Sequence, residues 1–502
     1  MIKVIFLSLF FLREIKSLLF WLYLWQLKNY HIGRFLAHFS TYKGKKLLLN
    51  SLLKLLILIL ALFNFSFFFI IILLYIIEIL SSRNIIRPQK TSKTLFLSVI
   101  IFSILIIFIF LIYNFDLYSL FFLIVLFDIL TPLIVSFIVL LFQPVTVILR
   151  NRIIGRAIKK RKSLENLLVI GITGSYGKST TKEYLKTILG GDFKVVTTPE
   201  NQNSEMGISN CILNDINEDH EIFICEMGAY NKGGIKLLSK IAQPKIGIIT
   251  GINNQHLATF GSQKNIIKAK FELIDSLPLE GLAVLNWDNQ YIKDNFKKDI
   301  YSIKCGLDIW AEDIKEGSFK LCNEKEEIVI NTKIMEPYNI PNLLICIAVA
   351  KKLGLTIEEI KERVLLIEDG LNISSYKNFD IINATYSSNF NGIISHLDYL
   401  KKWNGDKIII MPCLIELGSE AKNTHYEIGR KIGETCDLAI ITTKDYEKEL
   451  KNGAKHSGME NIIFTDKINE IYDKINSLNK SNSVILLESR VPKGIINKLK
   501  NE

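Results

Sequence analysis

Long apolar runs set the first 150 residues apart from the rest of the chain. Residues 47–80 are almost entirely apolar, and residues 94–115 and 117–142 form two further runs. A bilayer core of about 30 Å is crossed by about 20 apolar residues in a helix, so each of the last two runs fits one span. Residues 47–80 predict either one long tilted span or a tight pair of helices interrupted near Asn64.

An earlier apolar stretch, residues 4–25, is interrupted by Arg13, Glu14 and Lys16. It either spans a bilayer or lies in the interface with its charges in water. Its length and its central charges do not fit a cleaved signal peptide. We therefore expect about three to five membrane spans within residues 1–150.

After residue 165 the pattern changes to short apolar runs that alternate with helical periods, which is typical of βαβ units on a parallel sheet. Strands of a first set are expected over residues 167–172, 194–198, 221–227, 246–250 and 283–286. A helix over residues 343–353 leads to a second set, with strands expected over 380–382, 407–411, 438–442, 461–464 and 483–487. The predicted fold is a transmembrane helical region (1–150), a basic cytoplasmic linker (151–165), a central parallel-sheet α/β domain (166–349) and a smaller Rossmann-like α/β domain (350–502).

The charge is distributed as unevenly as the apolar residues. Residues 1–165 contain 20 Lys and Arg against 5 Asp and Glu, a net charge of +15, which leaves −4 for the remainder of a chain whose total is +11. This pattern indicates cytoplasmic anchoring next to anionic lipid, and it does not indicate nucleic acid as a partner. Basic residues between positions 150 and 162 place everything that follows in the cytoplasm. The seven cysteines lack the paired spacing of a zinc site, and a cytoplasmic chain keeps them reduced.

A glycine-rich segment, GITGSYGKSTT at residues 171–181, joins an expected strand to an expected helix. Such a loop turns several backbone N–H groups toward one place, and the helix adds its positive N-terminal end, so the segment suits phosphate oxygens. Lys178 is expected at the terminal phosphates, and the hydroxyl of Ser179 or Thr180 on Mg²⁺. The match is imperfect because Ile172 stands where the general pattern has glycine, but its context predicts ATP binding. The expected contacts are Gly174, Ser175, Gly177, Lys178, Ser179 and Thr180.

Polar residues follow several of the later strands. Asn201 and Asn203 are suited to a substrate amide or carboxylate, and Glu226 to Mg²⁺, because hard cations take carboxylate oxygen. His256 follows another strand, and Lys270 lies on the next expected helix. Each also has a simpler interpretation: a loop histidine, a helix-capping glutamate or a solvated lysine.

The order and spacing of these motifs resemble the Mur ligases of peptidoglycan synthesis, most closely the branch that adds D-alanyl-D-alanine. The resemblance extends from residue 166 to about residue 490. It rests on residues 173–183, 201–203, 226–229, 256–262 and 269–272, on Tyr338, Asn339 and Asn342 in place of an HN-x-x-N adenine element, and on TYSSN (385–389) and IELG (415–418) in the second domain. The resemblance implies that Asn339 contacts the adenine.

The resemblance also implies a reaction, in which ATP converts an acceptor carboxylate to an acyl phosphate that an incoming amine then attacks. Ser179 and Glu226 would hold one Mg²⁺. His256 and a carbamoylated lysine would hold a second ion, and by position that lysine is Lys270 rather than Lys268. The implied catalytic residues are Lys178, His256 and Lys270.

Several positions depart from the family. The membrane region replaces the usual UDP-binding domain, which allows a lipid-linked acceptor at the bilayer surface. Gly370 is followed by Leu371 instead of arginine, and Glu488 stands in an element that is usually K-G-S-R. Three interpretations stay open: a membrane-anchored ligase adding D-alanyl-D-alanine to a muropeptide precursor, a ligase acting on another envelope polymer, and a nucleotide-binding scaffold. The expected partners are these small substrates, membrane lipid and cell-wall synthesis proteins.

Overall fold

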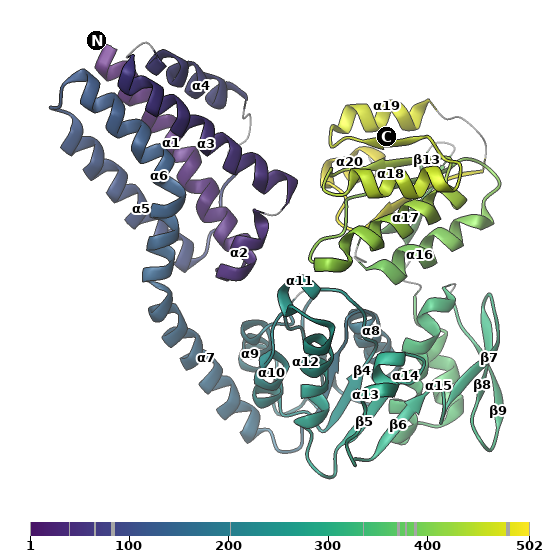
Figure 1. The fold of residues 1–502 in the computed structure, drawn as a ribbon. Helices are drawn as coiled ribbons and strands as arrows, with labels where there is room; N and C mark the ends of the chain where they lie inside the picture. Colours follow the sequence, from purple (N-terminus) through teal and green to yellow (C-terminus); the bar gives the residue numbers. More distant parts are fainter. Residues whose placement is uncertain are drawn as a thin grey trace. The chain divides into compact units, whose positions relative to one another are not determined.

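Two compact units divide the chain, Met1–Arg150 and Asn151–Glu502. The structure is a computed structural model that describes residues 2–39, 41–64, 67–81, 86–200, 202–334, 336–368, 372–376, 379–385, 389–477 and 482–500. The first unit is helical and the second is built from sheets and helices (Figure 1). The division follows the change in sequence pattern from long apolar runs to alternating strands and helices.

The first unit is a helix bundle. Its helices are α1 (Ile2–Leu27), α2 (Ile32–His38), α3 (Tyr42–Phe63), α4 (Phe67–Ser81), α5 (Ser92–Ile112) and α6 (Leu117–Leu141). Of the described helices, α3, α5 and α6 are long and apolar enough to cross a membrane. Helix α3 ends at Asn64, so residues 47–80 form a pair of helices and not one long span. Helix α1 packs against α4, α5 and α6, and it buries Phe10 and Trp25 in the bundle.

A cluster of charged side chains lies inside this bundle. Lys54 Nζ donates to Asp128 Oδ2 at 3.1 Å and lies 3.0 Å from Glu78 Oε1. Arg13 donates to Glu14 at 2.8 Å, to Glu78 at 2.8 Å and also to Asp128. Asp128, which lies within the apolar run 117–142, therefore faces protein cations, as burial of a charge in an apolar bundle requires.

Helix α7 (Gln143–Ser163) covers most of the stretch that we expected to be a basic linker, residues 151–165, so this stretch is mainly helical. The Arg161 guanidinium is buried and donates to the backbone carbonyls of Ala242, Leu164 and Leu167 at 3.0, 2.8 and 2.9 Å. Lys160 Nζ donates to two further carbonyls, those of Leu213 and Ile216. These bonds attach the end of α7 to the central α/β domain.

The central domain is built on a parallel sheet with the strand order β2-β3-β1-β4-β5-β6. The strands are β1 (Leu168–Thr173), β2 (Val195–Thr197), β3 (Ile222–Glu226), β4 (Ile246–Ile249), β5 (Leu282–Asn286) and β6 (Ser302–Cys305). The helices are α8 (Lys178–Leu189), α9 (Glu205–Asn214), α10 (Gly234–Ala242), α11 (Leu257–Phe260), α12 (Gln263–Asp275) and α13 (Gln290–Asn295). Because β1 lies between β3 and β4, the carboxyl end of β1 is a topological switch point, where such sheets bind ligands.

A small antiparallel sheet follows, which the sequence analysis did not predict. It contains β7 (Trp310–Lys315), β8 (Ser318–Cys322) and β9 (Glu327–Asn331). The chain then returns to the central domain through η1 (Pro337–Asn339), α14 (Ile340–Lys352) and α15 (Ile357–Val364). Ile360, Val364 and Ile367, which follow the boundary that we predicted between residues 349 and 350, belong to the core under the central sheet.

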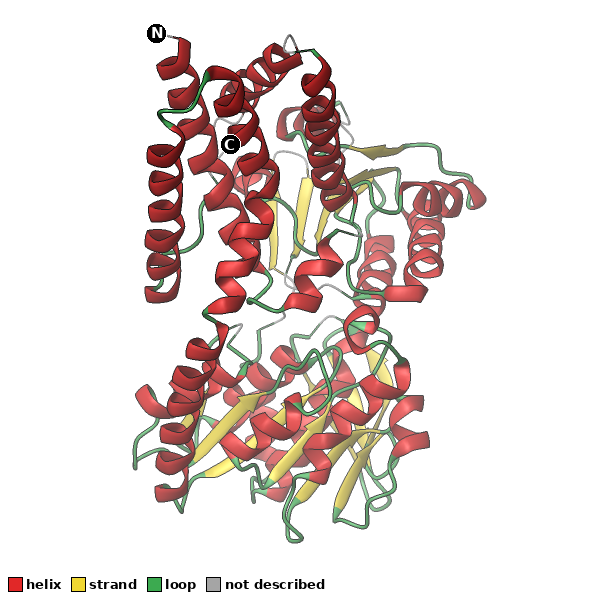
Figure 2. Ribbon diagram, turned by 60° about the vertical axis from the view of Figure 1, so that its left-hand side comes forward, coloured by secondary structure: helices red, strands yellow, loops and turns green. Residues whose placement is uncertain are grey.

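The last domain is a second α/β layer structure, with helices around a six-stranded sheet (Figure 2). Its strands are β10 (Asn372–Tyr376), β11 (Phe379–Ala384), β12 (Lys407–Met411), β13 (Leu438–Ile441), β14 (Ile462–Phe464) and β15 (Ser483–Glu488). The order is β10-β11-β15-β12-β13-β14, and every pair is parallel except β10 with β11. The helices are α16 (Phe390–Tyr399), α17 (Ala421–Thr435), α18 (Glu447–His456), α19 (Ile468–Asn476) and α20 (Lys493–Lys500).

Candidate functional site

The glycine-rich loop lies at the carboxyl end of β1 and leads directly into α8, as the sequence pattern predicts. Gly177 has φ +75°, and a Cβ there would lie only 2.6 Å from Asn342 Oδ1, so both conformation and space require glycine. A Cβ on Gly174 would lie 2.1 Å from Thr250 Oγ1. Ser175 N donates to Gly251 O at 2.7 Å, which ties the loop to the end of β4.

Lys178 is the first residue of α8 and turns back over the loop. Its ammonium donates to Gly174 O at 2.9 Å. Burial lowers the pKa of Lys178, and the charge of Glu226 opposes that shift. A phosphate group bound in the loop would offer this ammonium a stronger, charged acceptor than the carbonyl it now contacts.

The carboxylate of Glu226 lies beside the loop at the end of β3. Ser179 Oγ donates to Glu226 Oε2 at 2.8 Å, and Asn203 Nδ2 donates to Glu226 Oε1 at 2.9 Å. Glu226 is 5% exposed, and the ammonium of buried Lys182 lies 3.9 Å from it. The structure therefore brings Ser179, Asn203 and Glu226 together, whereas Asn201 lies outside the described residues.

His256 follows β4 and contacts the last domain. Its backbone has φ +65°, and its Nδ1 lies 2.6 Å from Glu416 Oε2 in the IELG segment. Burial lowers the pKa of His256; the hydrogen bond and charge of Glu416 oppose this shift, and the charges of Lys270 and Lys178 add to it.

Lys270 and Lys268 differ clearly in their surroundings, although both lie on α12. Lys270 is 3% exposed, whereas Lys268 is exposed. Burial, together with the nearby charge of Lys178, lowers the pKa of Lys270 to about 7. The charges of Lys178 and Lys270 both act on the imidazole of His256. Within the described part of the chain, no group of three or more His, Cys, Asp or Glu residues could by itself hold a metal ion.

A cavity of about 560 Å³ adjoins the loop, and its walls come from both α/β domains. The rings of Tyr176 and Tyr338 lie 5.9 Å apart beside it, and Asn289 Nδ2 donates to Tyr176 Oη at 3.1 Å. Asn342 lines the cavity and donates to Asn339 Oδ1 at 3.2 Å. Asn389, the last residue of TYSSN, and Leu417 of IELG line the other side.

Several residues of this cavity were not anticipated from the sequence. Tyr176 stands inside the glycine-rich loop, and an aromatic residue at that position is a sequence signal for a flat ligand. Asp288 and Asn289 follow β5 at the same sheet edge, but their spacing matches no motif. Residues 386–388 of TYSSN, together with Gly370 and Leu371, lie outside the described residues.

Comparisons with known proteins agree with this arrangement. Residues 172–350 match the Mur ligase middle domain. A UDP-N-acetylmuramoyl-tripeptide–D-alanyl-D-alanine ligase of Buchnera aphidicola (subsp. Baizongia pistaciae) is 30% identical over 307 residues, 58% of this chain and 66% of the relative. The ligase of the same name from Haemophilus influenzae is 28% identical over 355 residues, 66% of this chain and 76% of the relative. The chain thus spans just under two thirds of the length of the first relative.

Solved structures show the same similarity. MurF from Acinetobacter baumannii has a TM-score of 0.63 at 24% identity, covering 70% of this chain and 81% of that one. MurF ligase from Thermotoga maritima, in complex with ADP, has a TM-score of 0.60 at 25% identity, covering 69% of this chain and 84% of that one. The likeness extends beyond the glycine-rich loop to most of the described α/β region.

Proposed function

We propose that this chain, which is similar to the Mur ligases, is an ATP-dependent amide ligase. In this proposal it joins D-alanyl-D-alanine to a muramoyl-tripeptide, the reaction named for the curated relatives. The observation that carries the proposal is the 2.8 Å hydrogen bond from Ser179 Oγ to Glu226 Oε2 beside the phosphate-binding loop. A nucleotide-binding loop alone serves many activities, but this pair adds a position for a metal at the transferred phosphate.

The glycine-rich loop and the adjoining cavity suit the two ends of ATP, its phosphates and its nucleoside. The loop around Lys178 suits the phosphates, and the 560 Å³ cavity beside it offers Tyr176, Tyr338 and asparagine amides for the nucleoside. Planar rings stack on aromatic side chains, and amides pair with the edge of an adenine. The structure of the T. maritima relative was solved in complex with ADP, which supports an adenine nucleotide as the ligand.

The donors near the loop also suit Mg²⁺. Mg²⁺ is bound in proteins through one or two carboxylates, with water and substrate phosphate oxygens completing the octahedron. Glu226 provides one carboxylate and Ser179 one hydroxyl, and the amide of Asn203 holds the carboxylate in place. Bound there, the ion would offset negative charge on the transferring phosphoryl group.

A second ion site would need an additional anionic ligand near His256. The buried amine of Lys270, with a pKa of about 7, is partly neutral at physiological pH. A neutral amine adds to carbon dioxide to form a carbamate and releases one proton. We therefore propose carbamoylated Lys270 and His256 as ligands of this second ion, and exposed Lys268 as a bystander.

The chemistry proceeds in two steps in this proposal. An oxygen of the acceptor carboxylate attacks the γ-phosphorus of ATP, and ADP leaves. The amine of D-alanyl-D-alanine then attacks the acyl carbon, phosphate leaves, and the nitrogen loses a proton. In this proposal Lys178 stabilises the charge on the transferring group, and Asn203 orients the acceptor.

We further propose that the ligase works at the cytoplasmic face of a membrane. The three apolar helices α3, α5 and α6 support membrane insertion. Arg152, Arg156 and Lys159 are exposed on α7 and suit anionic lipid headgroups. An acceptor carried by a lipid would be as accessible there as one carried by UDP, and cell-wall synthesis proteins are suitable partners.

The test is phosphate release by the full chain in detergent, with ATP, Mg²⁺, UDP-muramoyl-tripeptide and D-alanyl-D-alanine. We expect release that requires both peptide substrates and that is lost in Lys178→Ala. Lipid-linked tripeptide replaces the UDP form in a parallel reaction, and another envelope polymer in a third. Nucleotide binding without release in any of these reactions would refute the ligase and leave the scaffold.

A further inference from the structure

A buried histidine connects the last domain to the nucleotide-binding segment of the central domain. His396 lies on α16 and is only 3% exposed. Its Nδ1 lies 2.5 Å from Glu488 Oε2, at the end of β15, and its Nε2 lies 2.9 Å from Glu336 Oε1, just before η1. Glu336 and Glu488 are themselves 2% and 0% exposed. One imidazole therefore contacts two buried carboxylates from different domains.

The contacts continue from Glu336 to the residues expected around the adenine. Asn339 Nδ2 donates to Glu336 Oε2 at 2.7 Å, and Asn342 Nδ2 donates to Asn339 Oδ1 at 3.2 Å. The amide of Asn342 in turn occupies the space beside Gly177 that a Cβ would need. A series of buried polar contacts thus runs from the last domain to Asn342, whose amide packs beside Gly177 of the phosphate-binding loop.

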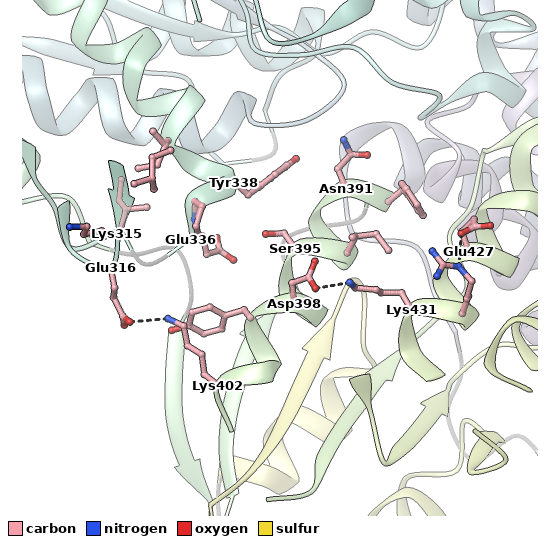
Figure 3. Close-up of a pocket in the computed structure, with 18 residues that line it drawn as sticks. Lys315, Glu316, Glu336, Tyr338, Asn391, Ser395, Asp398, Lys402, Glu427 and Lys431 are labelled. Atoms are coloured by element: carbon pink, nitrogen blue, oxygen red, sulfur yellow. Dashed lines mark hydrogen bonds and ion pairs between the residues drawn. The ribbon is translucent and has the colours of Figure 1, made fainter. Parts of the chain in front are cut away.

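The other end of α16 forms part of the nucleoside cavity. Asn389 caps this helix, and Phe390 and Asn391 begin it; all three line the 560 Å³ cavity. A second cavity of about 910 Å³ shares Tyr338, Phe390 and Asn391 with the first. Figure 3 shows its walls, with Glu336 and Tyr338 on one side and Ser395 and Asp398 on the other. His396 follows Ser395 directly, so its placement fixes where this helix meets the cavity.

We propose that His396 is a positioning residue that holds the two walls of the nucleoside cavity in register, through Glu336 on one side and Glu488 on the other. The proposal rests on the proposed function only for the identity of the ligand, an adenine nucleotide. Protonated, the imidazole donates from Nδ1 to Glu488 and forms an ion pair through Nε2 with Glu336. Charge-assisted hydrogen bonds of this kind are about twice as strong as neutral ones, and they are directional.

Exposed contacts between the same two domains do not provide this alignment. Lys402 Nζ lies 3.2 Å from Glu316 Oε2 (Figure 3), but both side chains are more than 40% exposed. Exposed pairs contribute little, whereas removal of one member of a buried charged group leaves its partners uncompensated. We therefore assign the alignment of the two cavity walls to His396 and not to Lys402.

The experiment measures nucleotide affinity and domain alignment in the full chain in detergent. Affinity is read from the fluorescence of N-methylanthraniloyl-ADP. Alignment is read from the distance distribution between spin labels in the double variant Lys293→Cys and Lys448→Cys. All seven native cysteines are buried, and Lys293 and Lys448 are exposed, so labelling is selective for the introduced positions.

For His396→Gln we expect a loss of nucleotide affinity of about tenfold or more, which corresponds to about 1.4 kcal/mol, together with a broadened label distance. The matched control is His456→Gln, at an exposed histidine, which should leave both readouts unchanged. Lys402→Gln should change affinity less than twofold. Affinity within twofold of wild type and an unchanged distance in His396→Gln would overturn the proposal.

A second variant tests the proposal in case His396→Gln does not fold. Glu488→Gln keeps the shape of the group and removes one charge, and we expect it to weaken affinity in the same direction. If Glu488→Gln folds and binds as wild type does, the proposal is wrong. The label distance can be measured without ligase activity. If the wild-type chain shows no ligase activity but His396→Gln still broadens the label distance, the proposed function is refuted and the role of His396 is not.

Discussion

The Nδ1 atom of His256 lies 2.6 Å from Oε2 of Glu416, although 160 positions separate the two residues in the chain. Both residues have positive φ, +65° in each case, and Ala258 N donates to Glu416 O at 3.1 Å. Two strained backbone positions therefore meet where the central and last domains contact each other. Strain of this kind persists when surrounding contacts determine it, and it is common at functional sites.

The first prediction concerns this pair. Glu416→Gln removes the charge that orients the imidazole of His256, the side chain proposed to hold a metal ion. We expect the rate of ligation to fall about tenfold to a hundredfold, the usual cost of losing such an orienting partner, while nucleotide affinity stays the same. Phosphate release and nucleotide titration measure the two quantities. Glu460→Gln, at an exposed position, is the control, and an unchanged rate in Glu416→Gln would contradict the assignment.

The second prediction separates the two lysines of α12. With ¹³C-bicarbonate, the wild-type chain should show a carbamate carbon signal by NMR that is lost in Lys270→Ala and kept in Lys268→Ala. Ligation should be lost in the first variant and nearly unchanged in the second, because only Lys270 is buried beside Lys178. A carbamate signal that survives in Lys270→Ala would exclude this lysine.

The third prediction is a pH dependence of nucleotide affinity. Burial lowers the pKa of His396, but the hydrogen bonds and charges of Glu336 and Glu488 outweigh burial and raise it to about 10. A raised pKa means that the stabilisation by the imidazolium is complete below about pH 6.5 and is lost as the pH rises through about 10. Affinity should be flat up to about pH 9 and then fall. If nucleotide affinity falls over the same pH range in His396→Gln, another group causes the pH dependence and the prediction is wrong.

The fourth prediction concerns the charged cluster of the bundle. Asp128→Asn leaves Lys54 and Arg13 with less opposing charge in an apolar interior, so it should destabilise the bundle by about 3–5 kcal/mol. Asp116→Asn, at an exposed helix cap, should cost about 1 kcal/mol or less. Thermal unfolding in detergent measures both. A double variant, Lys54→Met with Asp128→Leu, should recover much of the loss, and equal stability of Asp128→Asn and wild type would contradict the paired arrangement.

The sequence identifies elements whose determinants are local. Strands β1, β3, β4 and β5 are almost entirely apolar and buried, so the expected runs match them within one or two residues. The glycine-rich loop is recognised from the spacing of its glycines and Lys178. The polar residue Asn64 marks the end of α3 within an apolar run. The choice of Lys270 over Lys268 came from family resemblance, and the burial of Lys270 agrees with that choice without testing its role.

Features that depend on residues far apart in the sequence could not be predicted from local patterns. His396 and Glu336 belong to no motif, and Glu488 counted only as a departure from one, although the three meet in the fold. The small sheet β7–β9 consists of short strands with mixed exposure, so it lacks a clear alternation. The basic stretch after Arg150 has the composition of a linker, but the carbonyl contacts of Lys160 and Arg161 hold it as helix.

The charged cluster of the bundle has a consequence for biosynthesis. Arg13 is translated 115 positions before its partner Asp128. At about 5–20 residues per second, α1 exists for about 6–23 s before that carboxylate has been made. Glu14 and Glu78 are available to Arg13 earlier than Asp128, but an arginine without its full set of carboxylates is costly at the centre of a bilayer. In the proposed membrane arrangement α1 would therefore wait at the membrane surface, or with a chaperone or insertase, until α6 emerges. In the proposed membrane arrangement, the order of synthesis thereby makes α1 one of the last helices of the bundle to reach its final depth.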